Sequence, residues 1–138
     1  MRDRPLMALV AAAAILFSGH VVDHVARGDV QWPLTVDSVA FILVSVAVYA
    51  IIGLGLHLYV KGKVGPLFWA LVGGIGLAFG WFGHFSPFTD QPPRHILHAY
   101  STVTVGWLAL GCLAALMGVL IIAVAYAVHL WARQNHPG

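Results

Sequence analysis

Long apolar stretches alternate with short polar segments along this chain. There are four such stretches, at about residues 6–26, 38–60, 66–85 and 99–131. Each is long enough to cross the hydrocarbon core of a bilayer, which takes about 20 helical residues. A segment in lipid must satisfy its backbone hydrogen bonds internally. The pattern therefore predicts one all-α domain, an integral membrane bundle of four helices joined by short loops.

The fourth stretch is longer than a bilayer requires. At 1.5 Å per residue it would extend over roughly 50 Å as a continuous helix. We therefore expect this helix to tilt, to kink near Gly106 or Gly111, or to project beyond the membrane.

Basic residues are distributed unevenly between the two ends of the predicted bundle. One end carries Arg2, Arg4, Lys61, Lys63 and Arg133, and the other carries Arg27 and Arg94. The positive-inside rule then predicts that both termini are cytoplasmic and that loops 27–37 and 86–98 face outside. No clear small-x-small cleavage site lies between the apolar segment Leu6–Phe17 and His20, so we expect the first helix to be retained. The chain is predicted to be a multi-pass protein of the cell membrane, in contact with lipid.

The composition agrees with lipid as the solvent. Hydrophobic residues make up 60% of the chain and charged residues only 9%, whereas soluble domains carry about 25% charged residues. The net charge of +2 comes without any run of Lys or Arg, which argues against nucleic acid as a partner. The single Cys112 excludes an internal disulfide.

Glycines recur at intervals of three and four in the third stretch. They are Gly73, Gly76, Gly80 and Gly83. This spacing places them on one helical face, where small residues let a neighbouring backbone approach closely. We interpret the stripe as a helix-packing face, with a flat groove for a planar cofactor as the alternative.

Polar residues share one face near the outer end of the first helix. His20, Asp23, His24 and Arg27 follow one another at intervals of three and four, which aligns them on the helix surface. Two histidines four residues apart can hold one metal ion from consecutive turns. An ion pair between Asp23 and Arg27 would explain the same residues without a metal.

Further histidines and acids fall at the same outer end. It holds five of the eight histidines and four of the five acids. We predict a metal site with His20, His24 and His84 as ligands, Asp23 as a ligand or as a residue that orients an imidazole, and His98 and His95 completing the coordination. Asp37 and Asp90 are expected as supporting partners or loop caps. Imidazole and carboxylate donors suit zinc, iron, copper or manganese.

Three other functions remain open at this point. His57 and His129, near the cytoplasmic ends of the second and fourth helices, would clamp a b-type haem if those helices were neighbours. They would otherwise be interfacial anchors. The chain could also be an accessory subunit that packs against partner membrane subunits or its own copies, or a proton pathway through Asp23. Whether a metal site would serve an enzyme or metal handling is not decided by the sequence.

Overall fold

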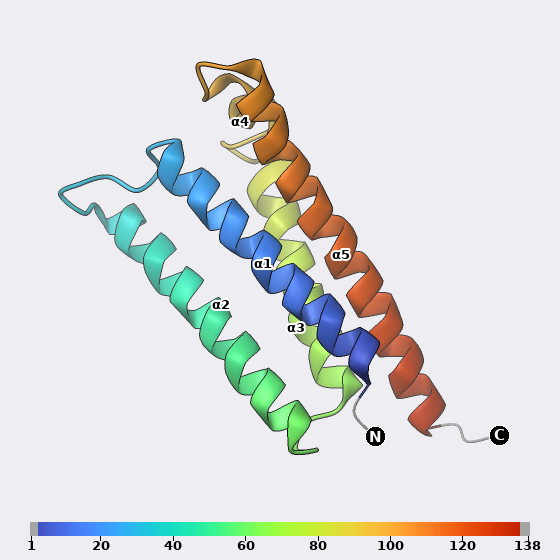
Figure 1. Ribbon diagram of the computed structural model, residues 1–138. Coiled ribbons are helices and arrows are strands. Elements are labelled where there is room, and N and C mark those ends of the chain that lie inside the picture. The colour runs from blue at the N-terminus through green and yellow to red at the C-terminus, as the bar shows by residue number, and fades with distance from the viewer. Residues whose placement is uncertain (1–2, 136–138) are drawn as a thin grey trace.

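The computed structural model describes residues 3–135 as helices joined by turns, with no strand among them. The elements are α1 (Arg4–Ala26), α2 (Val36–Val60), α3 (Pro66–Gly80), the π-helical turn η1 (Trp81–Phe85), α4 (Pro93–His98) and α5 (Val103–Asn135) (Figure 1). Four helices are long and apolar enough to cross a membrane: α1, α2, α3 continued by η1, and α5. The predicted all-helical class, with four helices that could span a membrane, is confirmed. Arg2 lies outside the described residues.

Local sequence signals account for the helix ends. Asp3 accepts a hydrogen bond from the amide of Leu6 at 2.9 Å, and Thr35 accepts one from the amide of Ser38 at 3.2 Å. Both are N-caps, which satisfy amides that lack a partner in the first turn. Gly28 ends α1 with a φ of 84°, a conformation that glycine adopts without steric cost at helix C-termini.

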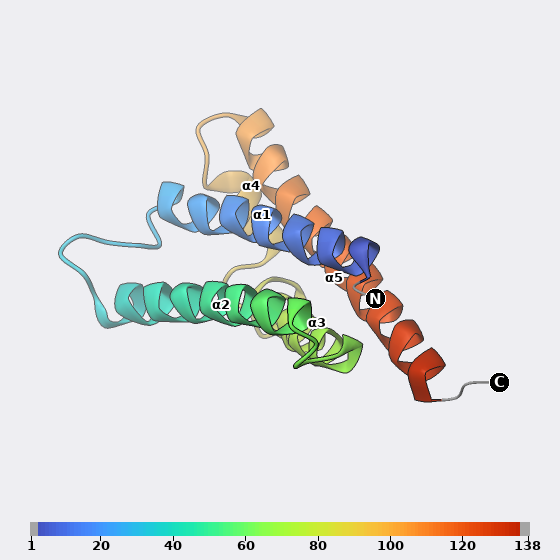
Figure 2. The same cartoon turned by 60° about the horizontal axis from the view of Figure 1, so that its bottom comes forward.

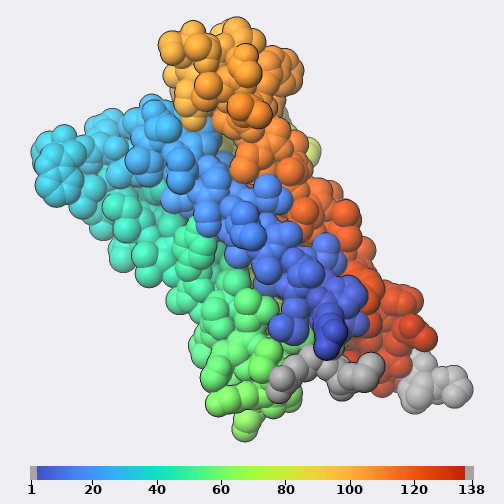
Figure 3. All heavy atoms as spheres, viewed as in Figure 1, coloured from blue at the N-terminus to red at the C-terminus, as the bar shows by residue number. Residues whose placement is uncertain are grey.

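The long helices are arranged with α1 and α3 between α2 and α5. Both α1 and α3 pack along α5, whereas α2 packs on α1 at the edge of the bundle (Figures 1 and 2). In the space-filling view, α1 lies between α2 and α5 (Figure 3). The start of α1 and the end of α5 lie at the same end of the bundle (Figure 1). A chain that crosses a membrane an even number of times would likewise have its first and last helices begin and end on the same side.

The glycine stripe of α3 faces α5. A Cβ atom on Gly73 would lie 2.7 Å from Val124, and one on Gly80 would lie 2.5 Å from the Sδ of Met117. A Cβ on Gly76 would be in ordinary contact with Leu120, 3.5 Å away, whereas one on Gly83 would meet nothing within 4 Å. Three of the four glycines therefore serve the predicted helix packing, and α5 side chains occupy the face suggested for a planar cofactor.

The fourth stretch forms one long helix, α5, so of the three predicted alternatives the kink near Gly106 or Gly111 is not seen. Helical hydrogen bonding continues through Gly106 and Gly111, and the chain turns instead at residues 99–102, between α4 and α5. α4 folds back onto α5 so closely that a Cβ on Gly106 would lie 2.7 Å from the carbonyl oxygen of Leu97. This close contact between α4 and α5 explains why the chain turns before Gly106, since only a residue without a side chain allows the contact.

Gly106→Ala should therefore destabilise the protein by about 1–3 kcal/mol, because its methyl group would collide with backbone that no rotamer change can move. Gly111→Ala is the matched control, since a Cβ there meets nothing within 4 Å. This control should be neutral, or stabilising by up to about 1 kcal/mol through helix propensity. Unfolding in detergent, followed by circular dichroism, measures both, and equal stability of the two variants would contradict the tight contact.

Candidate metal centre

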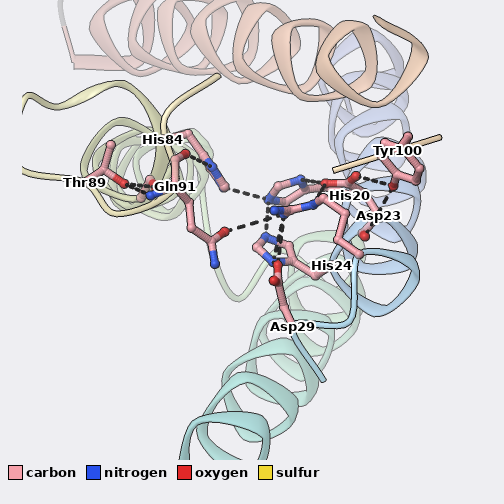
Figure 4. A network of polar contacts seen from close by, with 10 residues as sticks. His20, Asp23, His24, Asp29, His84, Thr89, Gln91 and Tyr100 are labelled. Atoms are coloured by element: carbon pink, nitrogen blue, oxygen red, sulfur yellow. Dashed lines mark hydrogen bonds and ion pairs between the residues drawn. The ribbon is translucent and has the colours of Figure 1, made fainter. Parts of the chain in front are cut away.

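Three buried histidines converge at the end of the bundle opposite the termini. His20 and His24 come from consecutive turns of α1, and His84 comes from η1 (Figure 4). Their exposed fractions are 9%, 8% and 5%. The Nε2 of His20 lies 3.2 Å from the Nε2 of His24 and 3.2 Å from that of His84. The predicted convergence of these three side chains is confirmed.

For two of the three pairs of nitrogens, this spacing is close to that of a tetrahedral metal site. Nitrogens bound to zinc at about 2.0–2.1 Å lie roughly 3.3 Å from one another when the angle is tetrahedral. Two pairs have almost this separation, and one donor atom from each of the three residues lies within 4.8 Å of the others. Within residues 3–135, this is the only set of three or more His, Cys, Asp or Glu donors so placed.

The π-helical turn delivers the third histidine. The amide of Ser86 donates to the carbonyl of Trp81 at 2.8 Å, five residues back, which adds one residue to the turn relative to an α-helix. His84 lies inside this turn and is buried, while Trp81 and Phe82 are exposed. The sequence carries no clear signal for such a turn. It predicts the end of the helix at which His84 lies, but not how the ring is presented.

Hydrogen bonds to the outer ring nitrogens select the tautomers of two imidazoles. The Nδ1 of His24 is 2.8 Å from a carboxylate oxygen of Asp29, and the Nδ1 of His84 is 3.2 Å from the backbone carbonyl of Gln91 (Figure 4). A carbonyl only accepts, so Nδ1 carries the hydrogen in His84. At His24 the 2.8 Å contact to the carboxylate of Asp29 favours the same tautomer, although a donor of Arg27 lies 3.2 Å from that nitrogen. Each Nε2 then presents its lone pair to the Nε2 of His20.

The Nε2 of His20 cannot satisfy both neighbours. One ring nitrogen has either one hydrogen or one lone pair, yet two lone-pair nitrogens lie 3.2 Å from it. A metal ion between the three nitrogens would accept a lone pair from each. The donor set could hold a metal ion, and the carboxylate and the carbonyl behind two of the rings match the partners that metal-bound histidines usually have.

Asp29 is a partner that the sequence interpretation did not single out. The chain folds back at the end of α1 and places Asp29 over the last helical turn. The amide of Asp29 donates to the carbonyl of His24 at 3.0 Å, and the amide of Gly28 donates to the carbonyl of Val25 at 3.1 Å. These two bonds form a Schellman motif. An acidic residue directly after the glycine that ends a histidine-bearing helix is the sequence signal that could have identified it.

Asp23 is engaged elsewhere and lies outside the set of three histidines. One carboxylate oxygen accepts from the Nε of Arg27 at 3.1 Å, and the other from the hydroxyl of Tyr100 at 2.6 Å. Its nearest approach to His20 is 4.0 Å, at Nδ1. The ion pair with Arg27 is thus present. Both carboxylate oxygens of Asp23 thus have other partners, and the Nδ1 of His20 is buried without a hydrogen-bond partner, so Asp23 makes no hydrogen bond to His20.

Tyr100 ties the turn between α4 and α5 to the last turns of α1. Its hydroxyl reaches Asp23 across 77 positions of sequence. Tyr100 lies outside the spanning helices, and partial burial together with the hydrogen bond to Asp23 raises its pKa to about 12. The phenol therefore stays protonated and remains a donor to the carboxylate. Sequence spacing could not identify this contact.

His95 and His98 do not join the other histidines. α4 buries Ile96 completely, and this orients His95 and His98 outward, where they line a surface pocket with Asp90 and Arg94. The expectation that they complete the coordination is not met, because α4 is a separate short helix whose apolar side faces α5. Asp37 and Asp90 are also exposed.

His57 and His129 lie on two helices that do not pack closely against each other. His57 is exposed on α2 and His129 is exposed on α5, and α2 packs mainly on α1 instead of α5. The haem hypothesis assumed that these helices are neighbours. Because that premise fails in the described part of the chain, no feature of the structure supports a haem between these two histidines.

Asp29→Ala should lower the affinity for a transition metal by about tenfold to a hundredfold, the usual effect of removing a group that orients a metal-bound imidazole. The free Nδ1 of His24 would then allow the wrong tautomer and ring rotation. Asp37→Ala removes an exposed carboxylate at the same end of the bundle and should leave the affinity unchanged. Competition with a chromophoric chelator measures both variants, and indistinguishable constants would remove Asp29 from the site.

Comparisons of the chain with protein-family models, with curated proteins and with solved structures give no match. What the chain does must therefore be inferred from the chemistry of the three histidines and the residues around them.

Proposed function

We propose that this protein binds one transition metal ion in the membrane through the Nε2 atoms of His20, His24 and His84. The observation that supports this best is the convergence of three buried imidazoles, two of which are anchored through Nδ1 with Nε2 facing inward. Imidazole donors suit zinc, copper and iron, whereas manganese prefers carboxylates. Three imidazoles without a carboxylate among them therefore favour zinc, copper or iron.

The distribution of basic residues supports an outward-facing centre. Arg4, Lys61, Lys63 and Arg133 belong to the end of the bundle far from the histidines, and such residues favour the cytoplasmic side. We infer that both termini are cytoplasmic and that the metal is bound near the extracytoplasmic surface of the cell membrane.

Catalytic metal centres typically have three protein ligands and an open position, whereas closed structural sites usually have four protein ligands. A metal with an open position can activate water or polarise a substrate. We therefore favour a metal-dependent membrane enzyme, with metal handling as the second function that the same three ligands would support. A metal-handling protein must release its ion readily, so slow exchange of the bound metal would favour the enzyme.

Elemental analysis of the protein purified in detergent tests the metal site. We expect about one transition metal ion per chain in the wild type and close to none in His20→Ala or His84→Ala, because two imidazoles hold an ion much more weakly than three. His95→Ala, which removes an exposed histidine at the same end, should keep its metal. Equal metal content in the wild type and in the His20→Ala/His84→Ala double variant would refute the proposal.

A further inference from the structure

We infer that the bound metal takes a small monoanion at its open coordination position, and that Arg27 holds the far end of this anion. The inference rests on the proposed metal site and adds the class of its external ligand. Its basis is the number of protein donors, the charge around the histidines and a hydrogen-bond donor of Arg27 that has no acceptor.

The first argument is the number of protein donors. Within residues 3–135, only His20, His24 and His84 bring donor atoms together. The two nearby carboxylates are already engaged, Asp23 with Arg27 and Tyr100, and Asp29 with His24 and Arg27. A four-coordinate ion would therefore have to take its fourth donor from outside the protein.

The second argument is electrical neutrality. Two carboxylates, of Asp23 and Asp29, and one guanidinium, of Arg27, surround three neutral imidazoles. This group carries one net negative charge, so a divalent ion turns it into one net positive charge. The side chains of Arg27 and Asp23 are 0% and 4% exposed, and uncompensated charge is costly in such surroundings. A single monoanion would restore neutrality.

The third argument is the free donor of Arg27. Its Nε and Nη2 are paired with Asp23 and Asp29, both at 3.1 Å, whereas its Nη1 is buried and has no hydrogen-bond partner. Buried donors in proteins nearly always have an acceptor. The Nη2 of the same guanidinium lies 3.2 Å from the Nδ1 of His24, so the guanidinium lies beside a ligand imidazole, on the side of its Nδ1. The proposed anion would extend from the metal past this imidazole to the free donor.

The ligand class that follows is a small monoanion with an acceptor at each end. Carboxylates such as formate and hydrogen carbonate have this form, and so does azide. One end would donate a lone pair to the metal, and the other would accept from the guanidinium through a charge-assisted hydrogen bond. Larger dianions would leave the site with a net negative charge.

Azide titration of the Cu²⁺-loaded protein in detergent tests the inference. Azide bound to Cu²⁺ gives a charge-transfer band, and we expect a saturable band in the wild type. Arg27→Met should weaken azide binding by roughly tenfold to a hundredfold, the effect of losing one charge-assisted hydrogen bond. Arg94→Met is the matched control, because Arg94 is exposed at the same end of the bundle and should leave azide affinity unchanged.

Arg27 is buried between two acids, so Arg27→Lys is a second variant for the case in which Arg27→Met does not fold. It keeps the charge, lacks the forked donor, and should bind azide more weakly than the wild type. Absence of an azide band in copper-loaded wild type overturns the inference while the metal site stands. A sample that takes up no copper overturns the metal site as well. Equal azide affinity of wild type and a folded Arg27 variant removes Arg27 from the anion site.

Discussion

Zn²⁺ should raise the free energy of unfolding by about 4 kcal/mol when the free ion is a thousandfold above its dissociation constant, since only the folded chain brings the three imidazoles together. The effect is large because of where the ligands lie. His20 and His24 belong to α1 and His84 to the turn that continues α3, and these two helices pack along α5 more than on each other. A bound ion would join them directly.

The measurement is unfolding in detergent, followed by circular dichroism at increasing free Zn²⁺. His84→Ala should lose almost the whole increase, because the remaining ligands both lie on α1 and no longer join two helices. His98→Ala removes an exposed histidine and should respond to zinc like the wild type. A zinc response in His84→Ala as large as that of the wild type would show that the ion binds elsewhere.

Asp23→Ala should destabilise the metal-free protein by about 3 kcal/mol, the lower end of the cost of leaving a buried charge without one of its partners. The guanidinium of Arg27 is fully buried and would keep only Asp29, 3.1 Å away, as an anionic partner. The hydroxyl of Tyr100 would lose its acceptor as well. Unfolding in detergent without metal gives the change in free energy.

Two further variants separate the buried charge from the lost hydrogen bond. Tyr100→Phe removes only the bond to Asp23 and should cost about 1 kcal/mol. Asp23→Ala/Arg27→Met removes both charges and should recover most of the stability that Asp23→Ala loses, because apolar replacements of a buried ion pair are often close to neutral. A double variant no more stable than Asp23→Ala would contradict this explanation.

The sequence by itself determined the four helices and the end of the bundle at which the histidines meet. A helix in lipid forms its hydrogen bonds locally, so the length of an apolar stretch predicts a span without knowledge of its neighbours. The first three spans accordingly end within a few residues of their predicted limits. The same local periodicity placed His20 beside His24 and aligned Gly73, Gly76 and Gly80 on one face.

Only the tertiary structure decided which polar groups touch the histidines. Asp29 reaches His24 because the chain reverses at Gly28, and Tyr100 reaches Asp23 because the chain turns at residues 99–102, before α5 begins. That turn also left His95 and His98 outside the group of buried histidines. These outcomes depend on turn geometry and on the close contact of α4 with Gly106. The contact of Tyr100 with Asp23 joins residues 77 positions apart, and hydrophobic periodicity carries no information about it or about the geometry of the turns.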